Sequence, residues 1–298
     1  MASQPQPTNL PLFFKELVPL NSNEHGKWKV RGLDNAEFLK DSHAIPLTVE
    51  EFPQAQRHYP IIFTVGDNPV PLALMGLNEG VNVYMNDDGK MKNPVYIPAY
   101  IRRYPFLLAK LRPDSQELSL CFDPSSGAVG DFKDGDAVFD DDGKPTETTQ
   151  NILKFCEQFE EAGARTGAFM TELKKYDLLM DGEVSIQQAG NDKPFIYRGF
   201  QMVNEEKLRD MRGDELRKLS QNGMLPLIHA HLFSLQVMRE VFSQQVAEGK
   251  VPQVTTAPTV DNATSASTTA TSAEKKESKP AAKKANSKKT SSKDAQIS

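Results

Sequence analysis

The sequence lacks most of the residues and motifs that reveal a chemistry. Its two cysteines, Cys121 and Cys156, are too few for a disulfide framework, and neither a CxxC motif nor a Cys/His cluster suggests zinc. The two could pair, but we interpret them as free, buried thiols. The signatures GxSxG, GxGxxG and GxxxxGK[ST] are missing too, so familiar hydrolase and nucleotide-loop chemistries lose support. We therefore expect no metal and no cofactor.

Long apolar runs are also missing. No stretch approaches the roughly 20 apolar residues that a membrane helix needs, so we expect no transmembrane segment. The first residues, MASQPQPTNLPLFFKELVPL, lack the basic region and continuous apolar core of a secretory signal. The default expectation is a soluble cytoplasmic protein, and export by a route without such a signal stays open.

Apolar residues are scarcest in the C-terminal segment, residues 249–298. Residues 251–298 hold no aromatic residue, and Ile297 is the one large aliphatic residue after Val260. Such a segment cannot offset the entropy cost of ordering it, so we predict a disordered Ser/Thr/Ala/Lys-rich tail. Eight lysines and four acidic residues give residues 251–298 a net charge of +4, which leaves −9 on residues 1–250 of a chain of −5. The basic tail could touch nucleic acid, an anionic surface or the body, but we favour a solvated, solubilising role over a nucleic-acid contact.

Residues 12–248 carry the pattern of an α+β domain, preceded by a polar, Pro-rich and flexible N-terminus over residues 1–11. In the first half, short apolar runs alternate with Gly, Asn, Asp and Pro, which predicts short, largely antiparallel strands. The predicted strands are LVPL (17–20), WKV (28–30), AIPLTV (44–49), YPIIFTV (59–65), PLALMGL (71–77), VNVYM (81–85) and LSLCF (118–122).

The second half predicts helices with a further β-hairpin. Apolar residues at three- and four-residue spacing indicate an amphipathic helix from a Thr146 cap to about Leu179, with Gly163 or Gly167 as the place where it would break. The later elements that we predict are strands 183–188 and 194–203 joined by a turn at 190–193, short helices after Asn204 and over 214–220, and a closing helix over 225–246.

Two acidic turns, Asn86–Gly89 and Asp134–Gly143, invite comparison with calcium loops. An EF-hand needs an acidic residue where this chain has Tyr84 or Val138. We therefore predict hairpin turns with exposed carboxylates, in which the glycine supplies a positive φ.

Two groups of residues could bind a ligand. His229 and His231 resemble a metal pair, but on a helix residues two apart point to different faces, so we expect packing or hydrogen bonding instead. The segment Arg102-Arg103-Tyr104-Pro105-Phe106 could present a forked cation beside aromatic rings, which suits a carboxylate or a phosphate. We favour the simpler interpretation of that segment, a strand edge with solvated arginines. The binding candidates are His43, His58, Arg102, Arg103, Tyr104 and Asp123.

Several unusual segments follow one another along the chain: LVPLNSNEHGKWKV (17–30), HAIPLTVEEFPQAQRHYPIIF (43–63), PAYIRRYPF (98–106), LCFDPSSG (120–127), VFDDDGKPT (138–146) and GMLPLIHAHLFSLQ (223–236). As a set, and in this order, they resemble the SapC family of bacterial proteins. The resemblance implies a link with surface-layer protein systems, and it supplies no catalytic residue set. In some bacteria the members of this family lie near outer-membrane receptor genes and oxygenase- or halogenase-type genes, which is an association and not a mechanism.

Two functions follow as hypotheses. The first is a non-catalytic binding or accessory protein, with a cell-envelope or surface-layer protein as its partner, which the resemblance favours. The alternative is an enzyme, or a partner of an oxygenase- or halogenase-type enzyme, that acts on a small molecule or peptide. Convergence of the six binding candidates in one pocket would support the enzyme, and their dispersal would support the binding protein. We favour the first hypothesis.

Overall fold

The computed structural model describes residues 10–92, 95–111, 117–187 and 194–250, which form helices and antiparallel strands in the predicted α+β arrangement. These residues belong to one contact-dense unit, residues 1–268, and a second unit, residues 269–298, lies outside the described residues. The predicted flexible N-terminus (apart from its last two residues), most of the tail and the 190–193 turn also fall outside the described residues. The domain boundaries therefore stay predictions.

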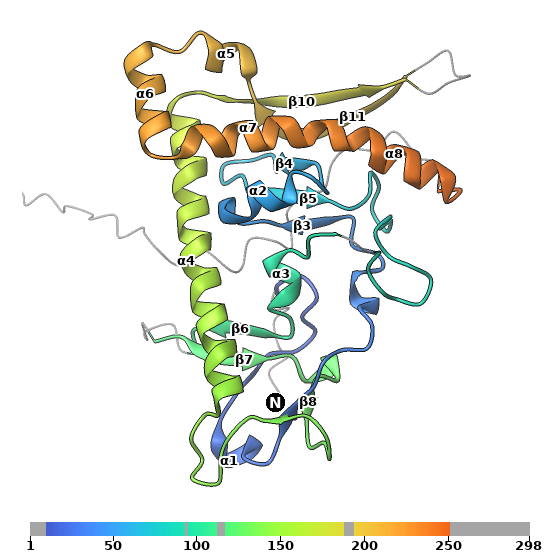
Figure 1. Cartoon of the computed structure of the whole chain (residues 1–298), viewed down its shortest axis with the longest axis vertical. Helices are drawn as coiled ribbons and strands as arrows, with labels where there is room; N and C mark the ends of the chain where they lie inside the picture. The colour runs from blue at the N-terminus through green and yellow to red at the C-terminus, as the bar shows by residue number, and fades with distance from the viewer. Residues whose placement is uncertain (1–9, 93–94, 112–116, 188–193, 251–298) are drawn as a thin grey trace, which may run out of the picture. The chain divides into compact units, whose positions relative to one another are not determined.

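The largest sheet combines strands from both halves of the chain (Figure 1). Its order is β10-β11-β4-β5-β3, and every neighbouring pair is antiparallel. The predicted hairpin is confirmed as β10 and β11, and β11 joins the early strands where Gln201 pairs with Phe63. The strands are β3 (Ala44–Pro46), β4 (Ile61–Phe63), β5 (Pro71–Leu74), β10 (Leu179–Ile186) and β11 (Phe195–Val203).

The closing helical segment packs on this sheet through a buried histidine. It consists of α7 (Met224–Ser234), the 3₁₀ turn η4 (Leu235–Val237) and α8 (Met238–Ala247), and Figure 1 shows α7 and α8 running in roughly the same direction as β10 and β11. Nε2 of His231 accepts a hydrogen bond of 3.1 Å from the Val203 N–H, and its Nδ1 lies 2.9 Å from the Ile61 carbonyl oxygen. His231 thus joins α7 to two strands by backbone hydrogen bonds, as the packing interpretation predicted.

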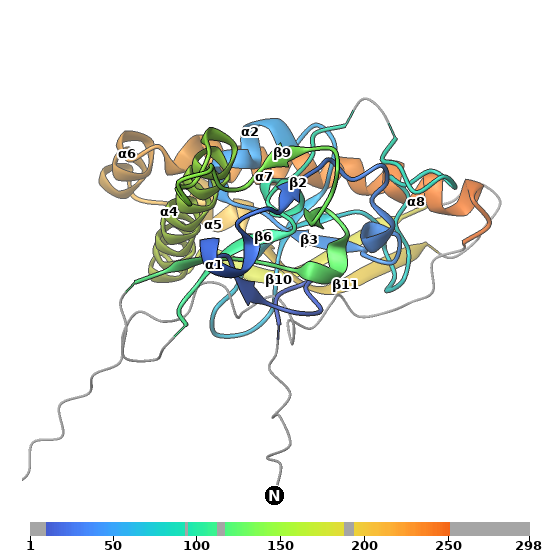
Figure 2. The same ribbon diagram turned by 90° about the horizontal axis from the view of Figure 1, so that it is seen from below.

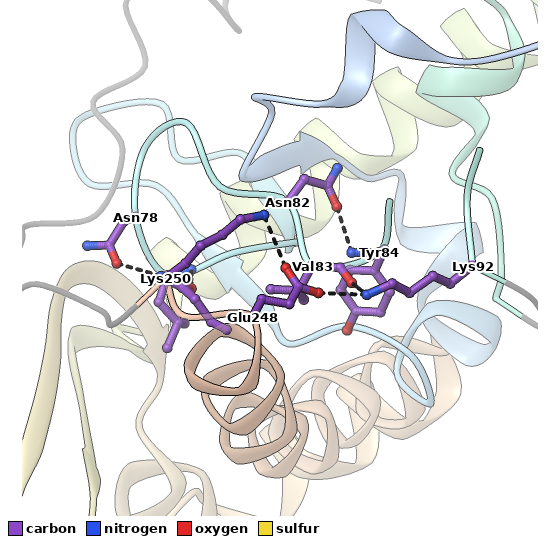
Figure 3. Close-up of polar contacts among 9 residues, drawn as sticks. Asn78, Asn82, Val83, Tyr84, Lys92, Glu248 and Lys250 are labelled. Carbon is purple, nitrogen blue, oxygen red and sulfur yellow. Dashed lines mark hydrogen bonds and ion pairs between the residues drawn. The ribbon is translucent and has the colours of Figure 1, made fainter. Parts of the chain in front are cut away.

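The end of α8 is held by polar contacts with the segment that follows β5 (Figure 3). Glu248 lies 2.7 Å from the Lys92 ammonium and 3.1 Å from that of Lys250. Lys92 also donates to the Val83 carbonyl, and the buried Gln245 accepts from the Leu77 N–H at 2.9 Å. These contacts position the last described turn of the chain.

Two three-stranded sheets carry the remaining strands. One has the order β1-β7-β6 and the other β8-β2-β9, again with antiparallel pairs. Phe122 of β7 packs against Trp28 and His25, which gives this region its own apolar cluster. The strands are β1 (Val18–Pro19), β2 (Lys29–Val30), β6 (Phe106–Ala109), β7 (Ser119–Phe122), β8 (Val129–Gly130) and β9 (Asp136–Ala137).

The long helix α4 (Glu147–Lys175) contacts both β6 and the segment after β3 (Figures 1 and 2). It starts at the predicted cap, since the Thr146 hydroxyl accepts the Thr149 N–H at 3.4 Å. The break considered at Gly163 or Gly167 was wrong, because the helix continues through both. In its middle, the Thr166 hydroxyl accepts a hydrogen bond of 3.0 Å from the Val49 N–H. One face of α4 is buried, as its apolar spacing predicted, and this face includes Cys156, Ala162, Thr166, Phe169, Met170 and Leu173.

The shorter helices include those predicted after Asn204 and over 214–220. None of the described helices is long and apolar enough to cross a membrane. The shorter helices and 3₁₀ turns are α1 (Ser22–His25), η1 (Glu37–Leu39), η2 (Val49–Glu51), α2 (Phe52–Ala55), α3 (Ala99–Arg102), η3 (Pro124–Ser126), α5 (Glu205–Arg209) and α6 (Gly213–Gln221).

Two local predictions were wrong. VNVYM (81–85) is not a strand, because the Asn82 side chain accepts the Tyr84 N–H and donates to the Leu39 carbonyl, and only Met85 makes a β-bridge. The arginines at 102 and 103 do not form a solvated strand edge, since α3 ends there and Arg103 is buried. The two acidic turns are confirmed, with φ of 75° at both Gly89 and Gly143.

Candidate functional site

Arg103 is a buried cation held between two aromatic rings. Its side chain is 2% exposed, and its Cζ lies 4.4 Å from the Tyr100 ring centroid and 4.3 Å from that of Phe159. Tyr100 belongs to α3 and Phe159 to α4, so the guanidinium lies between the two helices. Cation–π attraction of this kind strengthens when the cation is withdrawn from water.

The hydrogen-bonding capacity of Arg103 is only partly used. Its buried Nε and Nη2 have no hydrogen-bond partner among the described residues, and its Nη1 lies 3.7 Å from Oε1 of Glu160, beyond hydrogen-bond distance. Burial raises the pKa of Glu160, and the attraction of Arg103 offsets this only in part. A buried guanidinium with two unpaired nitrogens is costly, so such a group calls for an explanation.

The two unpaired nitrogens form one recognition edge. In a guanidinium, the N–H bonds of Nε and Nη2 point in nearly the same direction, as a fork whose spacing matches the two oxygens of a carboxylate. The residual contact with Glu160 uses the other nitrogen, Nη1. The edge best suited to a bidentate anion is therefore the edge that the protein leaves unpaired.

Arg103 lies in the wall of a cleft of about 370 Å³ between the end of α3, the start of β6 and the first half of α4. We call it the arginine cleft. Its polar groups besides the arginines are Thr148 and Asn151, whose side chains have no hydrogen-bond partner among the described residues. The lining residues are Arg102, Arg103, Phe106, Thr148, Asn151, Ile152, Phe155 and Cys156.

A second hollow, of about 430 Å³, adjoins the arginine cleft and shares Arg102, Phe106 and Ile152 with it. We call it the rim hollow. It adds the cations Arg31 and Lys90, against one acidic residue, Asp34. Residues 1–250 carry a net charge of −9, so this local excess of positive charge runs against the balance of the body. Such a concentration of cations favours an anionic ligand.

Glu51 fixes the start of α3, and therefore the position of Arg103. Its Oε1 accepts the Ala99 N–H at 2.6 Å and the Tyr96 hydroxyl at 3.0 Å, while its Oε2 accepts from both the N–H and the hydroxyl of Thr48. Burial, followed by the charge of Glu51, raises the pKa of Tyr96 to about 12. Because the carboxylate of Glu51 already accepts four hydrogen bonds, its role is structural.

Arg102 and Tyr104 flank Arg103 but differ from it in their contacts. Arg102 is exposed and already donates to the Ile97 carbonyl at 3.0 Å and to the Tyr96 hydroxyl at 3.3 Å. Tyr104 lines the rim hollow, and burial, followed by the charge of Asp123, raises its pKa to about 12. Neither residue presents an unpaired buried group.

The other three predicted candidates lie outside the arginine cleft. Asp123 is buried next to Tyr104 and accepts the N–H groups of Lys15 at 2.7 Å and Ser125 at 2.8 Å, which makes it a cap for η3. Burial lowers the pKa of His43, with Glu79 as the opposing charge. His58 accepts the Tyr84 hydroxyl with its backbone carbonyl. The structure thus groups Arg102, Arg103, Tyr104 and Asp123 around α3 and β7, and gives the two histidines different neighbours.

Both cysteines are free and buried, as predicted. Burial raises the pKa of Cys121 to about 11 and that of Cys156 to about 12, the latter despite the opposing charge of Arg103. Thiols with such pKa values are poor nucleophiles near neutral pH. Among the described residues, moreover, no group of three His, Cys, Asp or Glu side chains could hold a metal ion.

A separate groove of about 420 Å³ follows the second half of α4. Tyr100 and Phe159 belong to its wall as well as to the Arg103 site. Gly163 and Gly167 also line it, and a Cβ built on either would meet no atom within 4 Å. A methyl group at either position would therefore fit beside the groove without a clash.

Sequence reasoning missed Glu51, Tyr100, Phe159 and Glu160. Glu51, Phe159 and Glu160 lie more than 50 residues from Arg103 along the chain, and Tyr100 was missed because its segment was interpreted as a strand edge and not as a helical turn. The one available signal for Glu51 was the Thr48–Glu51 capping box, which is formed in the structure.

The comparisons with known proteins name one family. The SapC family profile matches residues 20–241, which covers α3, α4 and the whole arginine cleft. None of the curated proteins and none of the solved structures matches the chain.

Proposed function

The chain belongs to the SapC family, and from that premise we propose that it is a non-catalytic binding or accessory protein of cell-envelope or surface-layer machinery. The observation that carries the proposal is the arginine cleft with its rim hollow, where Arg31, Lys90, Arg102 and Arg103 gather on an acidic body. The family link with surface-layer systems supplies the cellular setting.

Several of the described groups that could do chemistry have structural roles instead. His231 uses both ring nitrogens in contacts with backbone groups, Glu51 accepts four hydrogen bonds, and Asp123 caps a turn. A nucleophile and its base must be free and within hydrogen-bond reach of each other. The thiols, with pKa values of about 11 and 12, do not meet that need. This pattern supports binding over catalysis.

The enzyme alternative has less support. It depended on six candidate side chains gathering in one pocket, and His43, His58 and Asp123 do not line the arginine cleft. Of the remaining candidates, Arg102 and Arg103 stay protonated near neutral pH, and the pKa of Tyr104, raised to about 12, makes its hydroxyl a poor general base.

Affinity capture from fractionated cells tests the proposal. The tagged full-length chain, with or without residues 251–298, is expected to retain an envelope or surface-layer protein. Lys90→Glu, which reverses a charge in the rim hollow, should abolish that capture, and Lys218→Glu, the same change on the exposed face of α6, should not. Capture of a redox enzyme alone, or equal capture by both variants, would contradict the proposal.

A further inference from the structure

We infer that the arginine cleft binds a carboxylate carried on an apolar body, and that Arg103 holds its two oxygens with Nε and Nη2. The inference rests on the binding role proposed above and names the ligand of that same site. It goes beyond the general excess of positive charge, because it assigns one edge of one guanidinium to one chemical group.

The first argument is the unused fork. Nε and Nη2 of Arg103 are buried and have no hydrogen-bond partner among the described residues, whereas the neighbouring Arg102 has two. A carboxylate at this edge would form two parallel, charge-assisted hydrogen bonds of about 2.7–2.9 Å. It would also supply the counter-charge that Glu160, at 3.7 Å from Nη1, supplies only weakly.

The second argument is preorganisation. The rings of Tyr100 and Phe159 lie 4.4 and 4.3 Å from Cζ and hold the guanidinium from two helices. A ligand therefore meets an arginine that has already lost its rotational freedom, and less affinity is spent on ordering it. Glu51 adds to this, because its hydrogen bond to the Ala99 N–H fixes the helix that carries Arg103.

The charge balance around Arg103 selects a single negative charge. Glu160 lies beside the guanidinium, and its carboxylate repels an incoming anion, more strongly a dianion than a monoanion. A carboxylate is therefore favoured over a phosphate.

The rest of the wall selects an apolar body for the ligand. Phe106, Ile152 and Phe155 give the cleft an apolar wall, and its volume of about 370 Å³ suits a small ring or a short chain. Both nitrogens of the fork are shielded from solvent, so the carboxylate reaches them by displacing neighbouring side chains of the wall. The measured affinity includes the cost of that displacement.

Isothermal titration calorimetry on the full chain tests the inference, with benzoate and hexanoate as probes. Benzamide serves as the uncharged control and inorganic phosphate as the competing anion. We expect both carboxylates to bind, with benzamide and phosphate at least about tenfold weaker, because one charge-assisted pair is worth that factor or more.

Three variants assign the binding to Arg103. Arg103→Lys keeps the charge but removes the fork, and should weaken benzoate binding at least about tenfold. Arg217→Lys, the same change on the exposed face of α6, is the matched control, and should change it less than about threefold. Glu160→Gln should strengthen it several-fold by removing the repelling carboxylate, an effect that a merely structural Arg103 would not produce.

Several results would overturn the inference: no carboxylate binding, equal binding of benzamide, tighter binding of phosphate, or an Arg103→Lys variant that is folded by circular dichroism and binds benzoate like the wild type. Should carboxylates fail to bind while Lys90→Glu still abolishes partner capture, the inference falls and the proposed function stands. If benzoate binds as expected but Lys90→Glu no longer affects partner capture, the proposed function falls and the inference about the carboxylate stands.

Discussion

Nη1 of Arg103 lies 3.7 Å from Oε1 of Glu160, so the nearest acid does not hydrogen-bond the buried guanidinium. The guanidinium packs instead between the rings of Tyr100 and Phe159, whose centroids lie 4.4 and 4.3 Å from its Cζ, within van der Waals contact. A structural arginine normally satisfies its donors within the fold, because unsatisfied buried donors destabilise it. Because Glu160 does not satisfy the donors of Arg103, the guanidinium is better suited to binding a ligand than to a purely structural role.

Glu51→Gln should lower the free energy of unfolding by about 3 kcal/mol. Each carboxylate oxygen of Glu51 accepts two hydrogen bonds. In glutamine an NH₂ group replaces one of these oxygens and cannot accept them, so two buried donors would lose their acceptor. Chemical denaturation measures the effect. Glu50→Gln is the matched control: its half-exposed carboxylate pairs with Arg165 alone among the described residues, so its loss should cost less than about 1 kcal/mol. Equal effects of the two substitutions would contradict the structural role of Glu51.

Gly163→Ala and Gly167→Ala should each stabilise the protein by about 1 kcal/mol. Alanine has the higher helix propensity, and a Cβ at either position meets no atom within 4 Å. The melting temperature should rise, most in the double variant. Gly182→Ala should do the opposite, because its Cβ would lie 2.2 Å from the Phe200 ring. A destabilised Gly163→Ala variant would show that the groove along α4 is closed.

Stability should fall as the pH is lowered from about 6.5 towards 4. Burial lowers the pKa of His231 to about 4, whereas the unfolded residue titrates near its usual value of 6.5. Between these values the unfolded chain binds a proton that the folded chain does not, so the stabilisation is complete above pH 6.5 and is lost towards pH 4, by at most about 3 kcal/mol. Urea denaturation at a series of pH values measures it.

Two variants distinguish the contributions of His231 and His43 to this pH dependence. Burial also lowers the pKa of His43, which adds a contribution of the same sign. His231→Gln should remove most of the pH dependence, at the cost of lower stability throughout, and His43→Gln should keep most of it. An unchanged slope in the His231→Gln protein would refute the assignment.

Neither thiol of the native protein should react readily with a thiol-specific reagent at pH 7.5. Cys121 and Cys156 are buried, with pKa values raised to about 11 and 12. Both should react at once in guanidinium chloride. Because Cys156 lines the arginine cleft, it should be the first thiol to react slowly in the native protein, and bound benzoate should slow that reaction further. Rapid labelling of either thiol in the native state would contradict their burial.

Removal of residues 251–298 should leave the melting temperature of the remaining protein unchanged. The composition of this tail, with no aromatic residue, gives it little apolar surface with which to dock. Differential scanning calorimetry of the full and truncated chains compares them. A clear drop on truncation would show that the tail packs on the body.

The secondary structure was predictable wherever a local pattern decided it. The helix from Thr146 and the hairpin of β10 and β11 were found because their apolar periods and caps lie within a few residues of each other. VNVYM (81–85) failed because Asn82 satisfies local backbone groups with its side chain, a choice that composition does not reveal.

The site was predictable in its residue type but not in its state. The sequence indicated a forked cation beside aromatic rings as one interpretation of residues 102–106. We favoured a solvated strand edge, because no residue near Arg103 in the chain indicates that its side chain is buried. That burial comes from Phe159 and Glu160, which reach it from a helix more than 50 residues away. The unpaired edge is likewise a property of the packed structure, and no local pattern encodes it.

The most direct test of the central claim is a crystal structure of the full chain grown with 4-bromobenzoate. We predict anomalous density for bromine in the arginine cleft, with the two carboxylate oxygens about 2.7–2.9 Å from Nε and Nη2 of Arg103. A carboxylate bound at the exposed Arg102 or elsewhere, with that edge of Arg103 still unpaired, would contradict it.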